Sequence, residues 1–140
     1  MIDFYNIPIR EINDIKNGAN FTTPKGEIIP NERLTSAAAP PRTYAYCSDT
    51  AYDESIVPHI KGVDVLYHEA TFGESELARA LKTGHSTARQ AAEIAKLAEV
   101  KKLVIGHYSS RYTSLTPLLE EAKAVFPTTE LAHEGKVIKL

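Results

Sequence analysis

The sequence contains a single cysteine, Cys47, and no apolar run long enough to cross a membrane. One cysteine cannot form an intrachain disulfide or a multi-cysteine zinc site. The first residues also lack the basic start and the apolar stretch of a signal peptide. We therefore expect a protein of the reducing cytoplasm that has no membrane partner.

A strong excess of either charge is also missing, since 16 Lys and Arg residues against 18 Asp and Glu residues give a formal net charge of −2. RNA binding would therefore depend on a local basic patch rather than on the charge of the whole chain. The chain has 140 residues, of which 43% are hydrophobic and 24% charged. This composition is typical of a folded globular protein and argues against disorder.

The sequence divides into two parts. Residues 1–43 form a lead-in segment, in which the spacing of Ile9, Ile12 and Ile15 predicts a short helix. A turn is expected at 23–26, and the Ala- and Pro-rich residues 37–41 form a surface connection. Residues 44–140 form the main domain, where strand and helix patterns alternate.

The main domain is predicted to be an α/β domain whose sheet, parallel or mixed, is flanked by helices. Its strands are expected at 44–47, 63–67 and 102–105, with a terminal hairpin at 130–132 and 136–138. In the helix that begins near Thr87, a capping box with Gln90 precedes a stripe of alanines, which predicts close packing on the sheet.

Four short polar clusters lie where an apolar segment ends or a helix begins. The carboxyl ends of the strands of an α/β sheet meet at one edge, so we expect these clusters to form one site. Their histidine and carboxylate content suggests a metal centre. The clusters are 48–50, 68–71, 85–87 and 107–112.

Asp49 and His107 are the candidate metal ligands. Asp49 directly follows the first strand of the main domain, and His107 follows the third strand and a glycine. Carboxylate oxygens and imidazole nitrogens both bind divalent metals. From spacing alone, Asp49 is also explained as a helix N-cap and His107 as a structural histidine, so both interpretations stay open.

His85 and Glu69 are candidate catalytic residues. His85 comes before a helix, where unpaired N–H groups and the helix dipole favour an anion. A His85–Glu69 pair beside a phosphate could deliver a proton to a leaving alkoxide. His85 is also explained as part of a helix cap. Its neighbour in the second cluster, His68, is expected to be structural because adjacent strand residues point to opposite faces.

The last cluster ends in Ser109, Ser110 and Arg111. Two hydroxyls and a guanidinium suit a phosphate, because arginine can grip one with two parallel hydrogen bonds. The alternative for Arg111 is a surface salt bridge.

Taken together and in this order, the four clusters resemble the C-terminal half of the ribonuclease Z family, which belongs to the metallo-β-lactamase superfamily. The matching runs are Ser48-Asp49-Thr50, His68-Glu69-Ala70-Thr71, His85-Ser86-Thr87 and His107 to Tyr112. The lead-in segment is similar to the stretch that precedes the aspartate in bacterial members. The resemblance therefore covers nearly the whole chain and implies half of an αβ/βα sandwich.

The resemblance implies a role for each matched residue. Asp49 would bridge two zinc ions, and His107 would be a terminal ligand of one of them. His85, oriented by Glu69, would assist the leaving group, and Ser109, Ser110 and Arg111 would contact phosphate. The implied activity is hydrolytic removal of 3′ trailers from precursor tRNA.

The sequence differs from the family at one position and lacks one family motif. Ser48 replaces the glycine usual before the aspartate, and the principal metal motif His-x-His-x-Asp-His does not occur in the sequence. We therefore expect this chain alone to be inactive. Alternatives are a non-catalytic phosphate- or RNA-binding module and another metallo-β-lactamase-type hydrolase. Half of a sandwich would expose an apolar sheet face, so a homodimer is also expected.

Overall fold

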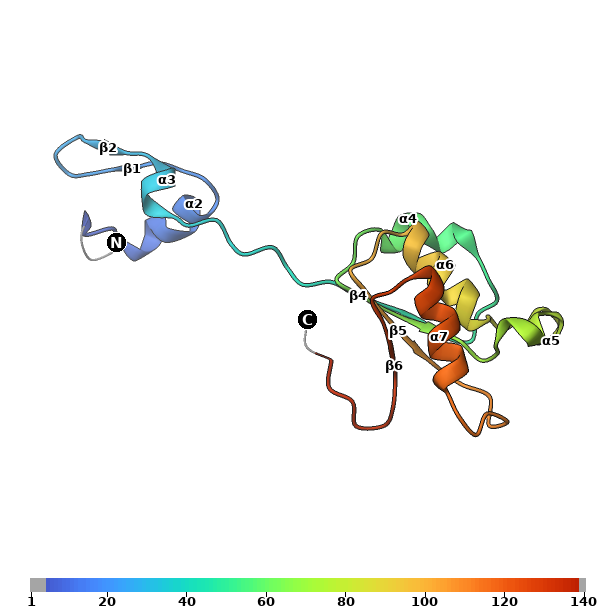
Figure 1. Cartoon of the computed structure of the whole chain (residues 1–140). Coiled ribbons are helices and arrows are strands. Elements are labelled where there is room, and N and C mark those ends of the chain that lie inside the picture. The colour runs from blue at the N-terminus through green and yellow to red at the C-terminus, as the bar shows by residue number, and fades with distance from the viewer. Residues whose placement is uncertain (1–4, 139–140) are drawn as a thin grey trace. The chain divides into compact units, whose positions relative to one another are not determined.

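The computed structural model describes residues 5–138 (Figure 1). The chain divides into two compact units, one ending at Pro40 and the other beginning at Pro41. Each unit is described by itself. No helix within residues 5–138 has the length and apolar character needed to cross a membrane.

The first unit is a small arrangement of helical turns and a two-stranded antiparallel sheet. Its elements are the 3-10 helix Ile9–Glu11, α2 (Ile12–Lys16), β1 (Phe21–Thr22), β2 (Ile28–Ile29) and α3 (Asn31–Leu34). The helix predicted from the isoleucine spacing forms, and Ile15 packs with Phe21 and Ile29 in the core of the unit. The Asn31 side chain donates to the Ile15 carbonyl at 2.6 Å and ties α3 to α2.

The second unit is built on a four-stranded parallel sheet in the order β3-β4-β5-β6. The strands are β3 (Tyr44–Cys47), β4 (Val65–Glu69), β5 (Lys102–Gly106) and β6 (Thr129–Leu131). Because all four strands are parallel, their carboxyl ends lie at one edge of the sheet. This finding confirms the α/β fold class and brings the ends of β3, β4 and β5 together.

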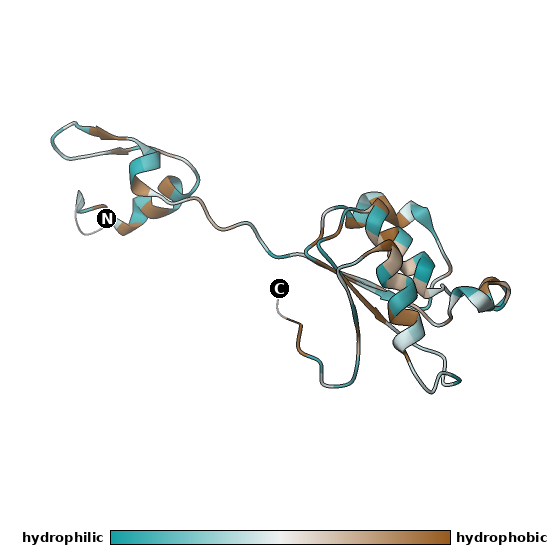
Figure 2. Cartoon of the chain, viewed as in Figure 1, coloured by the Kyte–Doolittle hydropathy of each residue, from teal (hydrophilic) through white to brown (hydrophobic). Residues whose placement is uncertain are grey.

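Helical crossovers join successive strands, as parallel pairing requires. They are the 3-10 helix Glu54–Ile56 with α4 (Val57–Ile60), the 3-10 helix Glu74–Glu76 with α5 (Leu77–Thr83), α6 (Ala88–Leu97) and α7 (Thr116–Val125). The predicted capping box of α6 is present, since the Thr87 side chain accepts from the Gln90 N–H and the Gln90 side chain accepts from the Thr87 N–H. Figure 2 shows hydrophilic and hydrophobic residues interleaved along α6 and α7, as expected of helices with one buried face.

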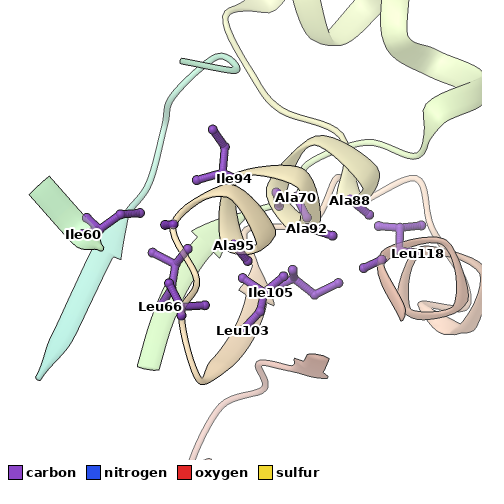
Figure 3. Close-up of a cluster of buried hydrophobic side chains, with 14 residues drawn as sticks. Ile60, Leu66, Ala70, Ala88, Ala92, Ile94, Ala95, Leu103, Ile105 and Leu118 are labelled. Carbon is purple, nitrogen blue, oxygen red and sulfur yellow. The ribbon is translucent and has the colours of Figure 1, made fainter. Parts of the chain in front are cut away.

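The core lies between the sheet and helices α4, α6 and α7 (Figure 3). Leu66, Leu103 and Ile105 project from β4 and β5 on this side, and all three are fully buried. The alanines of α6 face them, and their small side chains let the helix approach the strands closely. The predicted small-residue stripe thus becomes the packing face of α6: Ala88, Ala91, Ala92, Ala95 and Ala98.

The opposite face of the sheet is rich in tyrosine. Tyr46 and Tyr67 lie opposite each other on β3 and β4, and their rings stack with centroids 4.6 Å apart. Tyr44 and Tyr46 are 47% and 63% exposed. The sheet therefore presents aromatic surface on the side that its own helices do not cover.

The predicted terminal hairpin does not form. Among the described residues, β6 pairs with β5 alone, in parallel, and residues 136–138 form no strand. A turn joins His133 to Lys136, but the Lys136 ammonium then donates to the Leu131 carbonyl at 2.6 Å and pairs with Glu130 at 3.0 Å. The side chain of Lys136 thereby takes an edge carbonyl that a hairpin partner would have used.

Helix α6 ends in a Schellman motif that has glutamate in place of the usual glycine. The Val100 N–H donates to the Ala95 carbonyl at 3.2 Å, and the Glu99 N–H donates to the Lys96 carbonyl at 3.2 Å. Glu99 has a φ of 53°, in the left-handed region that glycine adopts without steric cost. The helix end is therefore less stable than it would be with glycine.

We predict that Glu99→Gly stabilises the second unit relative to Glu99→Ala by about 1 kcal/mol, because both variants lose the exposed pairing with Lys61 and only glycine relieves the backbone. Chemical denaturation of the two variants measures the difference. Equal stability of the glycine and alanine variants would contradict this account of the helix end.

Candidate functional site

The candidate site is built from residues that end or follow three parallel strands. Asp49 follows β3, Glu69 ends β4, and His107 follows β5. His107 Nε2 lies 3.0 Å from Asp49 Oδ1. The loop between α5 and α6 adds His85, whose Nδ1 is 2.8 Å from Glu69 Oε1. The four residues expected to share a site are thus brought together.

Glu69 is fully buried, and both of its carboxylate oxygens accept hydrogen bonds. Oε1 accepts from the Thr50 N–H at 3.0 Å and faces His85 Nδ1. Oε2 accepts from the Thr71 N–H at 3.1 Å and from the Thr71 hydroxyl at 2.6 Å. Burial by itself would raise the pKa of Glu69, but these hydrogen bonds outweigh it and hold the pKa below the ordinary value. The side chain is therefore a carboxylate, and it acts as an acceptor only.

Thr71 is the central residue that the sequence did not single out. Besides Glu69, its hydroxyl oxygen lies 2.9 Å from His107 Nδ1, 2.9 Å from the His107 carbonyl and 3.4 Å from His85 Nδ1. The only available signal was its place at the end of the His-Glu-Ala-Thr run. A threonine between two apolar neighbours is otherwise an ordinary residue of a strand end.

His85 stands where a left-handed glycine, Gly84, ends α5. Its ring lies beside that of His107, with centroids 5.3 Å apart, and against the edge of Phe72. Because Nδ1 faces Glu69, Nε2 is the ring nitrogen left for a substrate or a metal. His85 is therefore placed to act toward the open part of the site.

The expectation that the N-terminus of α6 binds an anion is wrong. The N–H of Gln90 donates to the Thr87 hydroxyl at 3.1 Å, and the N–H of Arg89 donates to Glu121 Oε1 at 2.9 Å. Glu121 comes from α7, so a carboxylate of the chain itself already occupies the position that the helix dipole favours for an anion. A phosphate would have to bind elsewhere.

Asp49 and His107 share an unusual backbone. Their φ angles are 50° and 58°, in the left-handed region that is uncommon for residues other than glycine. Gly106, just before His107, is required for a different reason, since a Cβ there would lie 2.3 Å from the Tyr67 hydroxyl oxygen. Tyr67 is the side chain that lies close to this glycine.

The predicted phosphate-contacting residues lie in the loop that follows His107. The Ser109 N–H donates to the Thr71 carbonyl at 3.0 Å, which ties the start of this loop to the site. Ser110 and Arg111 are exposed. Arg111 forms no salt bridge within residues 5–138. The structure brings Ser109 to the edge of the site and leaves the Arg111 guanidinium exposed, without a partner among the described residues.

The remaining histidines lie outside the cluster. His68 is fully buried, its Nδ1 donates to the Glu69 carbonyl at 2.8 Å, and burial lowers the pKa of its imidazole. Its Nε2 has no hydrogen-bond partner within residues 5–138. His59 lies in α4, and His133 follows β6 with its Nδ1 3.0 Å from the Glu134 carbonyl. None of the three contributes to the candidate metal ligands.

The residues present fit a metal ion. One potential ligand atom from each of Asp49, His85 and His107 lies within 4.8 Å of the other two. A carboxylate and two imidazoles are common ligands of zinc, and three protein ligands with an open position are typical of catalytic zinc. The expected pair, Asp49 and His107, thus has a third candidate in His85.

Comparisons with known proteins identify the family of this chain. The family described as "Beta-lactamase superfamily domain" matches residues 33–108. The ribonuclease Z of Parabacteroides distasonis is 62% identical over 135 residues, which are 96% of this chain and 44% of that protein. The ribonuclease Z of Bacteroides thetaiotaomicron is 59% identical over 140 residues, which are 100% of this chain and 44% of that protein.

Solved structures show the same fold. The metallo-beta-lactamase fold protein YhfI from Bacillus subtilis superposes with a TM-score of 0.65 at 28% identity, over 70% of this chain and 40% of that one. A long form RNase Z from yeast gives a TM-score of 0.53 at 28% identity, over 62% of this chain and 12% of that one.

The chain spans less than half the length of the curated relatives it matches. Its resemblance to part of ribonuclease Z is confirmed by identities of 62% and 59% to proteins of that name. The matched family covers more than half of the chain and includes Asp49, Glu69, His85 and His107. With its parallel sheet and its histidine–carboxylate cluster at the strand ends, the chain belongs to the beta-lactamase superfamily.

Proposed function

We propose that the chain is part of a zinc-dependent endoribonuclease that removes 3′ trailers from precursor tRNA by phosphodiester hydrolysis. The observation that carries the proposal is the convergence of Asp49, His85 and His107 above the buried Glu69 carboxylate. The high identity to proteins named ribonuclease Z supports the substrate class. The cytoplasm, where tRNA is processed in bacteria, is the proposed location.

Asp49 and His107 would hold the metal. Their facing atoms, Oδ1 and Nε2, are 3.0 Å apart, a separation that two ligands of one ion can have. When bound, zinc supplies an activated water and stabilises the negative charge that develops on the phosphate. The chain's own contribution is to fix the direction of these two ligands at the ends of β3 and β5.

His85 and Glu69 would handle the proton of the leaving group. With His85 Nδ1 directed at the Glu69 carboxylate, a proton on Nε2 can pass to the departing ribose oxygen. The buried Glu69 carboxylate accepts from His85 Nδ1 and keeps the ring in one orientation. Proton transfer would use His85 Nε2, because the hydrogen bonds of His85 within the described residues involve Nδ1.

Ser109, Ser110 and Arg111 would contact a phosphate of the tRNA. Arg111 is exposed and free of salt bridges in the described part of the chain, so its guanidinium can form two parallel hydrogen bonds to a phosphate. The N-terminus of α6 is already capped by Glu121, which leaves the loop after His107 as the better candidate for substrate contacts.

The activity is proposed for a longer protein, of which this chain is a part. Asp49 and His107, the two proposed ligands, cannot hold two zinc ions, since zinc sites normally use three or four protein ligands each. The remaining ligands and the general base would come from the portion of the relatives that this chain does not match.

We predict that the 140-residue chain alone gives no detectable processing of precursor tRNA in zinc buffer. A chimera in which this chain replaces the matching part of Bacteroides thetaiotaomicron ribonuclease Z should cleave it, because the missing ligands are then restored. Gel analysis of labelled precursor measures both. Stoichiometric cleavage by the chain alone, abolished by a chelator, would contradict the incomplete-site account.

In the chimera, we predict that His85→Ala lowers kcat by about 10²- to 10⁴-fold with little change in KM, because the lost group acts in proton transfer. Arg111→Ala should mainly raise KM, and Arg111→Lys should fall in between, because lysine keeps the charge but not the paired hydrogen bonds. Steady-state kinetics on precursor tRNA separates the two effects.

An unchanged kcat in His85→Ala would refute the proton-transfer role. An inactive chimera, together with specific tRNA binding by the chain alone that Arg111→Ala abolishes, would favour a non-catalytic RNA-binding module instead.

We further propose that the isolated chain forms a homodimer through the tyrosine-rich sheet face, since Tyr44 and Tyr46 are its exposed aromatic residues. Tyr46→Lys should shift the chain toward the monomer in light scattering. Leu81→Lys is the matched control, because Leu81 is equally exposed, at 62% against 63%, but lies in α5 away from the sheet. A wild-type monomer would contradict the proposal.

A further inference from the structure

Thr71 occupies a position in which one hydroxyl connects two groups of the site. Its Oγ1 lies 2.6 Å from Glu69 Oε2 and 2.9 Å from His107 Nδ1. The side chain is almost completely buried, at 6% exposure. Its backbone is held on both sides, by its N–H to Glu69 and by its carbonyl, which accepts from the Ser109 N–H. The hydroxyl therefore has a fixed location.

The proton positions follow from the chemistry of the partners. A threonine hydroxyl has one proton to donate, and a carboxylate can only accept. The shortest of its contacts is to Glu69, so the hydroxyl proton points at Oε2. Toward His107, Oγ1 is then an acceptor, and the donor must be the imidazole Nδ1–H. The His107 carbonyl, at 2.9 Å, is a neutral acceptor that competes poorly with the anion.

This arrangement determines which nitrogen of His107 faces the site. With the proton on Nδ1, a neutral imidazole carries its lone pair on Nε2, which lies 3.0 Å from Asp49 Oδ1. Without a cation, a lone pair on Nε2 and the Asp49 carboxylate repel each other at this distance, so Asp49 favours a proton on Nε2 while Thr71 favours it on Nδ1. A metal ion bound beside both atoms removes this conflict. His85 is arranged in the same way, because its Nδ1 is 2.8 Å from the other Glu69 oxygen.

We propose that Thr71 is a positioning residue: its hydroxyl donates to the Glu69 carboxylate and accepts from His107 Nδ1–H. The second hydrogen bond favours the imidazole tautomer whose Nε2 is free to bind the metal. The inference rests on the proposed function only in taking His107 as a metal ligand. It assigns Thr71 a part in the site through His107, and not through contact with the substrate. Glu69 thereby orients both histidines, His85 directly and His107 through Thr71.

The test uses the 140-residue chain carrying Asp49→Ala, with ¹⁵N-labelled histidine, at pH 8 and without metal, because the metal-free Asp49 carboxylate would itself draw the proton to Nε2. Long-range ¹H–¹⁵N spectra distinguish the two tautomers of each ring. In this background we expect the Nδ1–H form of His107 with Thr71 intact and with Thr71→Ser, which keeps the hydroxyl. In Thr71→Val, which has nearly the same shape but no hydroxyl, the Nε2–H form should appear.

His68 is the internal control in these spectra. Its Nδ1 donates to the backbone carbonyl of Glu69 and makes no contact with Thr71, so its tautomer should be the same in all three proteins. A change at His68 would mean that the valine variant disturbs the strand itself.

Zinc affinity provides the second measurement, by competition with a metal indicator. Thr71→Val should weaken zinc binding by about 10- to 100-fold, the usual cost of losing a hydrogen bond to a ligating histidine, whereas Thr71→Ser should bind within a few-fold of the wild type. Far-UV circular dichroism confirms that each variant is folded.

Three results would overturn the inference. The first is an Nε2–H form of His107 in the Asp49→Ala chain with Thr71 intact. The second is a folded Thr71→Val with unchanged tautomer and zinc affinity. The third is a Thr71→Ser that behaves like Thr71→Val, which would make the methyl group the important part. None of these measurements involves tRNA, so the proposed ribonuclease activity can fail while the role of Thr71 stands, and the reverse.

Discussion

The site depends on one buried negative charge. The Glu69 carboxylate has no exposed surface and is kept ionised by donors from three different segments of the chain. The Thr50 N–H and His85 Nδ1 hydrogen-bond to Glu69 and hold the Asp49 loop and the loop before α6 in place. The Thr71 hydroxyl hydrogen-bonds to Glu69 and also contacts His107. An isolated buried charge would be strongly unfavourable, so the folded state is stable only when these donors are in place. The requirement to solvate Glu69 therefore assembles the site.

The sequence predicted where the candidate site lies better than it predicted the hydrogen bonds between the residues of the site. Asp49, Glu69 and His107 were expected together because parallel strands place their carboxyl ends at one edge, and this rule needs no knowledge of side-chain contacts. Thr71 could not be found in the same way. Its importance comes from hydrogen bonds to His107, 36 residues away, and a local pattern contains no information on such a pairing.

The errors in the prediction have a common cause. The N-terminus of α6 was expected to be free for an anion, and the C-terminal residues were expected to form a hairpin. In both places a charged side chain takes the backbone group instead: Glu121 of α7 accepts from the start of α6, and Lys136, five residues after Leu131, donates to the end of β6. Local preferences for helix ends and hairpins describe backbone groups without competitors. A single long side chain changes the outcome.

The left-handed backbone conformations of Asp49 and His107 lower the stability of the fold at the candidate site. Each such residue costs of order 1–3 kcal/mol and persists only where the surroundings enforce it, and here both belong to the same pair of facing candidate ligands. Glycine at either position would relax the chain and remove the ligand. Mutations that increase thermal stability should therefore accumulate at these two positions wherever selection for activity is relaxed. Retention of aspartate at position 49 and histidine at position 107 would therefore indicate a protein that is still selected for activity, and not for folding alone.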